Sequence, residues 1–301
     1  MEETLTPEAA ASLLQAISEG QGIEDSVSTQ TLLALAEMAL DLERMEICEK
    51  LALSGHKKAS FDEDKEAIAW SLFLIARVKL SDTLQRIEEA RFDESEIHID
   101  AILLGALQEA RNAAERLEDL RLIGNIDQLE GIHQRAIGDV EGARNSFVRS
   151  LASKEETGDV IGIANSLHSL GEIAMDLNQF EDALGFFDRA AETYETAGEM
   201  LDCAHAMSLS SHALIKINKL DDAAKRLENA LEIGRDNEDP STQIVAHWGL
   251  ADLGHLRQDI ALELENLQAA VVLFIHLEIP VPDALRIRLD EMIDGLESRE
   301  P

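Results

Sequence analysis

The chain has 301 residues, of which 45% are hydrophobic, so it is long enough to bury a substantial core. It carries 60 acidic and 26 basic residues, which gives a formal net charge of −34 at pH 7. A surface this negative repels phosphate backbones and anionic lipid headgroups, so neither nucleic-acid binding nor membrane-surface binding is expected. Three explanations of the acidity stay open: simple solubility, selection of a basic partner, or adaptation to high salt.

The composition favours helices throughout. Segments typical of strands, in which β-branched and aromatic residues run between turns, are scarce, and aromatic residues make up only 4% of the chain. Alanine, leucine and glutamate dominate instead, and these are strong helix formers. The sequence therefore predicts an all-α protein. Its two cysteines, Cys48 and Cys203, lie in apolar helical patterns and are expected to be buried free thiols.

The first third of the chain has helical patterns without a clear repeat. Pro7 predicts a helix start, because proline suits the first helical position. Residues 29–53 look like one degenerate repeat copy. The segment Ser60–Glu63 resembles a capping box, which predicts that the helix carrying Trp70 opens there. Residues 96–120 are predicted to form one long helix.

From residue 124 onward the same pattern returns every 40 residues. A small residue precedes the turn in each copy: Gly131, Gly171, Ser211 and Ala251. The first position after the turn that repeats is small, with one exception: Ala143, Ala183, Ala223 and Glu263. Four residues further on, the position is large and apolar: Phe147, Phe187, Leu227 and Leu267. Three residues after that, it is small again: Ser150, Ala190, Ala230 and Ala270. Small residues let antiparallel helices approach closely, and large apolar residues fill the space between neighbouring pairs. Polar breaks at Asn178 and Asn218 predict the turns.

These columns resemble the tetratricopeptide repeat family. The family's Leu-Gly, Ala, Phe and Ala stand here as Leu170-Gly171, Ala183, Phe187 and Ala190. The resemblance implies an α-solenoid, a right-handed superhelix of stacked antiparallel helix pairs. Because the usual period is about 34 residues, copies of 40 imply an extended type. Most copies lack the family's tryptophan and tyrosine in the first helix.

Three segments are expected along one continuous solenoid. Residues 1–123 hold degenerate helical repeats, and residues 124–279 hold four 40-residue repeats. Pro280 and Pro282 end the last repeat, so residues 280–301 supply a capping segment with an amphipathic helix over 283–298. Two stacked halves meeting near residue 122 are the alternative.

The sequence contains no phosphate loop, dinucleotide fingerprint, nucleophile elbow or zinc-protease helix. The chain is therefore predicted not to be an enzyme, and no cofactor or metal ion is expected. The longest apolar run found, Ala269 to Ile275, is far shorter than the about 20 residues that span a membrane. The start Met1-Glu2-Glu3 has neither a basic region nor an apolar signal core, so a cytoplasmic location is expected.

The resemblance further implies a concave groove lined by first-helix side chains that are not used for packing. The family's groove positions fall on Asn125, Gln128, Arg135, Asn165, His168, Glu172, His205, Ser208, His212, Trp248, Asp252 and His255. Trp248 is either an aromatic anchor for a partner or an ordinary packing residue. Glu172 and Asp252 suit a partner that carries lysine or arginine. The groove histidines either make ordinary polar contacts or act in metal binding or pH sensing.

These features predict a protein- or peptide-binding adaptor or scaffold. Two alternatives belong to other classes: a regulatory sensor that binds a small signalling ligand within the superhelix, and an acidic chaperone for a basic client. No oligomeric state follows from the sequence.

Overall fold

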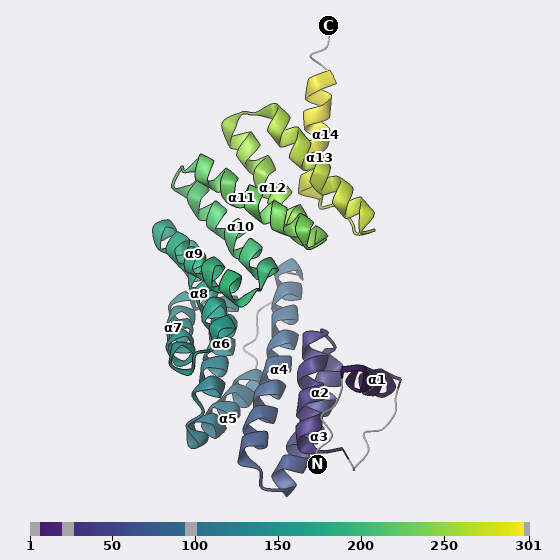
Figure 1. The fold of residues 1–301 in the computed structure, drawn as a ribbon, viewed down its shortest axis with the longest axis vertical. Helices are drawn as coiled ribbons and strands as arrows, with labels where there is room; N and C mark the ends of the chain where they lie inside the picture. Colours follow the sequence, from purple (N-terminus) through teal and green to yellow (C-terminus); the bar gives the residue numbers. More distant parts are fainter. Residues whose placement is uncertain (1–6, 20–26, 94–100, 298–301) are drawn as a thin grey trace. The chain divides into compact units, whose positions relative to one another are not determined.

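The computed structural model describes residues 7–19, 27–93 and 101–297 (Figure 1). These residues form fourteen helices and no strand, which confirms the all-α prediction. The chain divides into two compact units, Met1–Gly158 and Asp159–Pro301. The predicted boundary after residue 123 separates degenerate from regular repeats and is a different kind of division from that between the two compact units. It stays a prediction. Within the described part of the chain, no helix combines the length and apolarity needed to cross a bilayer.

The first unit is built from successive helices that pack side by side. Helix α1 (Pro7–Ser18) lies against α2 (Thr29–Asp41) and α3 (Met45–Phe61). Next, α4 (Lys65–Asp93) packs between α3 and α5 (Ala101–Leu117), and α6 (Leu120–Ala136) pairs with α7 (Val140–Thr157). The buried side chains of α1 to α6 form one apolar cluster, so the degenerate repeats share a core with the first regular one.

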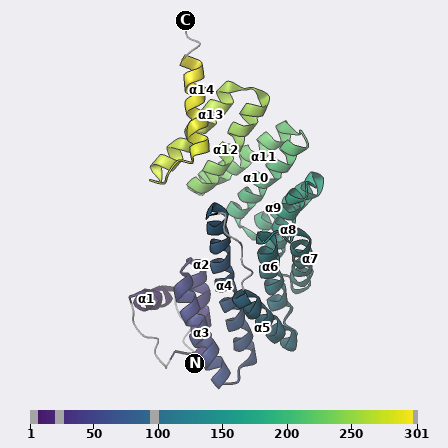
Figure 2. The ribbon, with the colours of Figure 1, turned by 180° about the vertical axis from the view of Figure 1, so that it is seen from behind.

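The second unit contains three antiparallel helix pairs and one additional helix. The pairs are α8 (Val160–Asp176) with α9 (Phe180–Ala197), α10 (Met200–Lys216) with α11 (Leu220–Asp236), and α12 (Pro240–Arg257) with α13 (Ile260–His276). Consecutive pairs stack through α9 on α10 and α11 on α12. Helix α14 (Asp283–Glu297) lies beside α13 in both views (Figures 1 and 2). The predicted solenoid of stacked antiparallel helix pairs is confirmed.

One type of turn joins the helices of the repeats. A residue with positive φ occurs every 20 residues from Glu118 to Glu278, and Gly138 and Asn178 are two of them. The N–H of the following residue donates to the carbonyl five positions back, as from Asp139 to Gln134 at 2.8 Å, which closes the helix end as a Schellman motif. Asp139 then caps the next helix by accepting the N–H of Gly142 at 3.0 Å. Each 40-residue repeat is therefore two similar 20-residue half-repeats.

The small and large columns meet inside the helix pairs α6–α7 and α8–α9. A Cβ added at Gly171 would lie 2.6 Å from Cε1 of Phe187, and one at Gly131 would lie 2.5 Å from Cε1 of Phe147. Both phenylalanines are fully buried. The two copies with glycine have phenylalanine opposite, whereas the copies with Ser211 and Ala251 have the smaller leucine in that column. The side-chain volume is thus shared between the two helices of a pair.

Two predictions about the N-terminal helices are wrong. The segment Ser60–Glu63 is no capping box, because Ser60 and Phe61 end α3 and Asp62 is its C-cap. Glu63 takes the positive φ of the turn, and Asp64 caps α4 by accepting the N–H of Ala67 at 3.0 Å. The helix predicted over 96–120 ends at Leu117, where the same turn begins, and its residues before 101 lie outside the described ranges.

The thiols are placed as expected. Cys48 and Cys203 are both buried and free, and burial raises the pKa of the Cys48 thiol to about 11. The segment 29–53, expected to be one degenerate copy, spans α2 and the first half of α3, and Cys48 lies on the buried face of α3.

Candidate partner-binding surface

In the first unit, the candidate residues Asn125, Gln128 and Arg135 lie on α6, and all three are half-buried. The Gln128 carboxamide oxygen lies 3.2 Å from the hydroxyl of Ser150 on α7, which also donates to the carbonyl of Gly124 at 2.8 Å. Gln128 therefore points toward the second helix of its own pair. A helix position can be carried over from the repeat pattern, whereas the direction of a long polar side chain depends on its packing partners.

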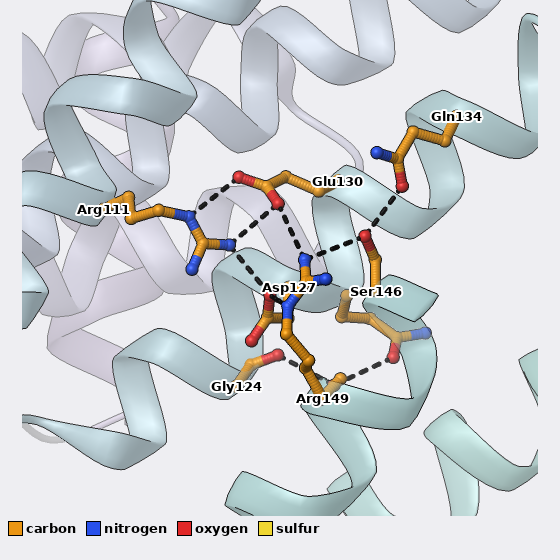
Figure 3. A network of polar contacts seen from close by, with 9 residues as sticks. Arg111, Gly124, Asp127, Glu130, Gln134, Ser146 and Arg149 are labelled. Carbon is orange, nitrogen blue, oxygen red and sulfur yellow. Dashed lines mark hydrogen bonds and ion pairs between the residues drawn. The ribbon is translucent and has the colours of Figure 1, made fainter. Parts of the chain in front are cut away.

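A polar network that the repeat pattern did not predict joins α5, α6 and α7 (Figure 3). Asp127, whose side chain is only 2% exposed, accepts hydrogen bonds from Arg111 at 2.8 Å and from Arg149 at 2.9 Å. Glu130 forms ion pairs with the same two arginines. A buried carboxylate is tolerated only when it is paired and hydrogen-bonded, and Asp127 finds these partners on the helices to either side, Arg111 of α5 and Arg149 of α7. The sequence signal for this network was Asp127, an acidic residue among the apolar positions of α6.

In the second unit, imidazole rings gather on the first helices. His168 of α8 stacks on His205 of α10, with ring centroids 5.1 Å apart and planes 12° apart. The same ring meets Phe187 edge-on at 5.8 Å. His168 is half-buried and His205 is exposed. The stack connects two neighbouring repeats, and the exposed ring of His205 stays accessible to a partner.

His212 lies on α10, two helical turns after His205, and part of the residue is exposed. Burial by the surrounding protein nevertheless lowers its pKa, which the carboxylate of Asp252 raises in part and the charges of Lys216 and His205 lower further. The imidazole is therefore neutral at pH 7 and offers one donor and one acceptor. Glu172 of α8 is half-buried on the same helix as His168.

Two candidates of this unit are occupied by contacts within the repeats. Asn165 is exposed, but its side-chain oxygen accepts the hydroxyl of Tyr194 on α9 at 2.5 Å. Ser208 is buried at 2% exposure and donates to the carbonyl of Ala204 at 3.0 Å. Ser208 therefore does not lie on the exposed face where the family's pattern placed it, because a serine this small is covered where α10 packs.

The last three candidates lie on α12, and two of them, Trp248 and Asp252, lie against residues of α14. Trp248 packs half-buried against the apolar cluster of Ala251, Leu267 and Leu285, so in this chain it makes packing contacts. Asp252 accepts a hydrogen bond at 2.5 Å from Arg288 of α14. The exposed His255 lies with Nδ1 3.2 Å from the Glu263 carboxylate.

Arg288 also explains the break in the small column. Its Nε donates to Glu263 at 2.7 Å, and its Nη2 donates to the carbonyl of Ala251 at 3.0 Å. The side chain of Glu263 is 8% exposed. The acid at this alanine position stands in the last helix pair, where α13 runs unbroken from Ile260 to His276, and it binds a cation from α14. Arg288 was missed because its partners lie 25 and 36 residues away in the chain.

Comparison with known proteins agrees with the repeat pattern. Residues 166–201 match the model of the tetratricopeptide repeat family, which covers the copy with the clearest columns. The structure of apo RapI has a TM-score of 0.68 at 12% identity, covering 90% of this chain and 72% of RapI. A Rap protein in complex with Competence and Sporulation Factor has a TM-score of 0.63 at 15% identity, covering 96% of this chain and 81% of its own.

BtubC from P. vanneervenii has a TM-score of 0.60 at 17% identity, covering 86% of this chain and 95% of BtubC. At these identities the similarity concerns the fold alone. No curated protein matches the sequence significantly.

Proposed function

We propose that the chain, a tetratricopeptide-repeat protein by its repeat match and its helix pairs, is a non-enzymatic adaptor or scaffold that binds a protein or peptide segment in the cytoplasm. The observation that carries the proposal is that His205, which stacks on His168, and His212 are both exposed residues of helix α10 in the second unit. Imidazole rings hydrogen-bond through their ring nitrogens and stack on planar groups, as a peptide-recognition surface requires.

The charge of the chain favours a basic segment as partner. Glu172 lies one helical turn after His168 on α8, Asp252 lies on α12 where it already pairs with Arg288, and the whole chain has a formal charge of −34. Electrostatic complementarity mainly speeds association and rejects acidic competitors, so a lysine- or arginine-bearing segment gains most from this surface. A chaperone for a basic client would use the same charge without a defined site. The absence of a catalytic sequence motif supports a binding role without chemistry.

The second candidate is a sensor for a small signalling ligand. The structure of a Rap protein complexed with Competence and Sporulation Factor favours it, because that protein has a similar fold and binds a factor. A sensor would retain its ligand through purification from its native cells, and native mass spectrometry of the purified chain would detect the added mass.

Affinity capture with matched variants tests the adaptor proposal. The binding variant is His205→Ala with His212→Ala, and the control is Glu228→Ala with Asn229→Ala, two exposed residues on the second helix α11. We expect one recurrent protein that the histidine variant loses and the control variant keeps. Equal recovery by both variants would remove the first-helix face from the proposal.

A further inference from the structure

Among the side chains of the second unit that the structure describes, those of helix α14 include the fewest buried ones. Among its described side chains only Leu285 is fully buried, at 1% exposure, whereas Ile287 and Ile293 face solvent. Leu289 and Met292 are partly buried against the same cluster as Leu285. Every other helix of the unit buries at least four residues. An element with few buried contacts opens at the lowest cost, so α14 is the helix that detaches first.

The surface under α14 is built to hold a guanidinium group. Arg288 donates to Asp252, to Glu263 and to the carbonyl of Ala251, so three acceptors from α12 and α13 converge on one cation. If α14 detaches, the nearly buried carboxylate of Glu263 loses this partner, and leaving a buried charge unpaired is strongly unfavourable. The detached state therefore favours a second guanidinium at the same place.

The repeat columns show that this site is particular to the last pair. Ala143, Ala183 and Ala223 fill the column in the earlier copies, and only the copy next to α14 carries an acid there. A solenoid end that needed only a cover could keep alanine and bury more apolar surface. The acid adds a requirement for a cation in the covering helix.

We propose that the α12–α13 surface formed by Trp248, Ala251, Asp252, Glu263 and Leu267 is a receptor for an arginine-bearing amphipathic helix, and that α14 is an internal ligand which a partner's helix displaces. This deepens the proposed binding function and rests on it. The partner helix repeats the spacing of Leu285, Arg288, Leu289 and Met292, with an apolar residue three before the arginine and others one and four after it. A basic helix is favoured by the net charge of −34.

The probe is a labelled peptide with the sequence of residues 282–297, added to the full-length chain. Wild-type protein should bind it weakly, because the tethered α14 competes at a high effective concentration. The Leu285→Asp variant loses the buried apolar contact of Leu285 and should bind the peptide at least about tenfold more tightly. A peptide carrying Arg288→Ala should bind that variant about tenfold more weakly or worse, since it lacks the charge-assisted hydrogen bonds.

The proposal is overturned if the Leu285→Asp variant binds the peptide no more tightly than the wild type does. It is also overturned if that variant binds the peptides with and without the arginine equally well. Hydrogen exchange of the wild-type chain gives a second test that needs no variant. The amides of α14 should exchange well before those of α10 and α11, and exchange of α14 only together with them contradicts a displaceable helix. Because His205 and His212 are untouched, loss of partner capture through those residues and failure of the α14 peptide are separate results.

Discussion

At the scale of single residues, the helix pairs are matched by volume. Gly131 and Gly171 each face a buried phenylalanine so closely that a methyl group would overlap the ring. Gly185 on α9 has no neighbour within 4 Å of its missing Cβ. At Gly171 the packing against Phe187 excludes any side chain, whereas at Gly185 a side chain has room and would reduce the backbone entropy of the unfolded chain.

Replacing Gly171 by alanine should destabilise the chain by about 1–2 kcal/mol, because overpacking against Phe187 outweighs the better helix propensity of alanine. The matched control Gly185→Ala should stabilise it by about 0.5–1 kcal/mol. The double variant Gly171→Ser with Phe187→Leu copies the pairing of Ser211 and Leu227, and it should cost less than the sum of its single changes. Urea unfolding measures all of these, and strict additivity would contradict the volume match.

At the scale of elements, one turn ends every helix of the repeats, but its residue at positive φ is not always suited to it. Gly138, Gly158 and Gly198 adopt this conformation freely, and asparagine at 178 and 218 tolerates it. Glu118, Glu238 and Glu278 take the same conformation at an energetic cost of about 1–2 kcal/mol each. The turn is imposed by the packing of the helices on either side.

The Glu238→Gly substitution should therefore stabilise the second unit by about 0.5–1 kcal/mol. Glycine removes the strain of the positive φ, but it also gives the unfolded chain more freedom, which offsets part of this gain. Glu238→Gln keeps the strain and removes the charge, so its stability should stay near that of the wild type. A thermal melt distinguishes the two. Equal stabilisation by both substitutions would mean that charge, and not backbone conformation, is the cause.

The same turns show how far the sequence predicts the elements. Asn178 and Asn218 marked two turns correctly, because asparagine is common there. The 20-residue half-period was missed, since glutamate and glutamine fill several of its turn positions and carry no turn signal. Ser60 was assigned to a cap because a local motif cannot show that α3 continues through it. Helix positions were thus predictable, whereas contacts such as Arg288 with Glu263 depend on tertiary packing.

At the scale of the whole molecule, the excess of negative charge is the dominant electrostatic feature. With 60 acidic and 26 basic residues, the chain carries a formal net charge of −34. Mutual repulsion of like charges destabilises a compact state, and dissolved salt screens it. The ion pairs of buried Asp127 and Glu263 are screened much less, because low exposure keeps salt ions away from them.

Raising NaCl from about 0.05 M to about 1 M shortens the screening length to about 3 Å, so repulsion across the surface should largely vanish. We expect the melting temperature to rise by about 5 °C or more, since about 1 kcal/mol shifts it by roughly 2–4 °C in large domains. An uncharged solute at equal osmolality separates screening from exclusion effects. A melting temperature that stays flat with salt would count against salt adaptation and leave solubility or a basic partner as the reason for the charge.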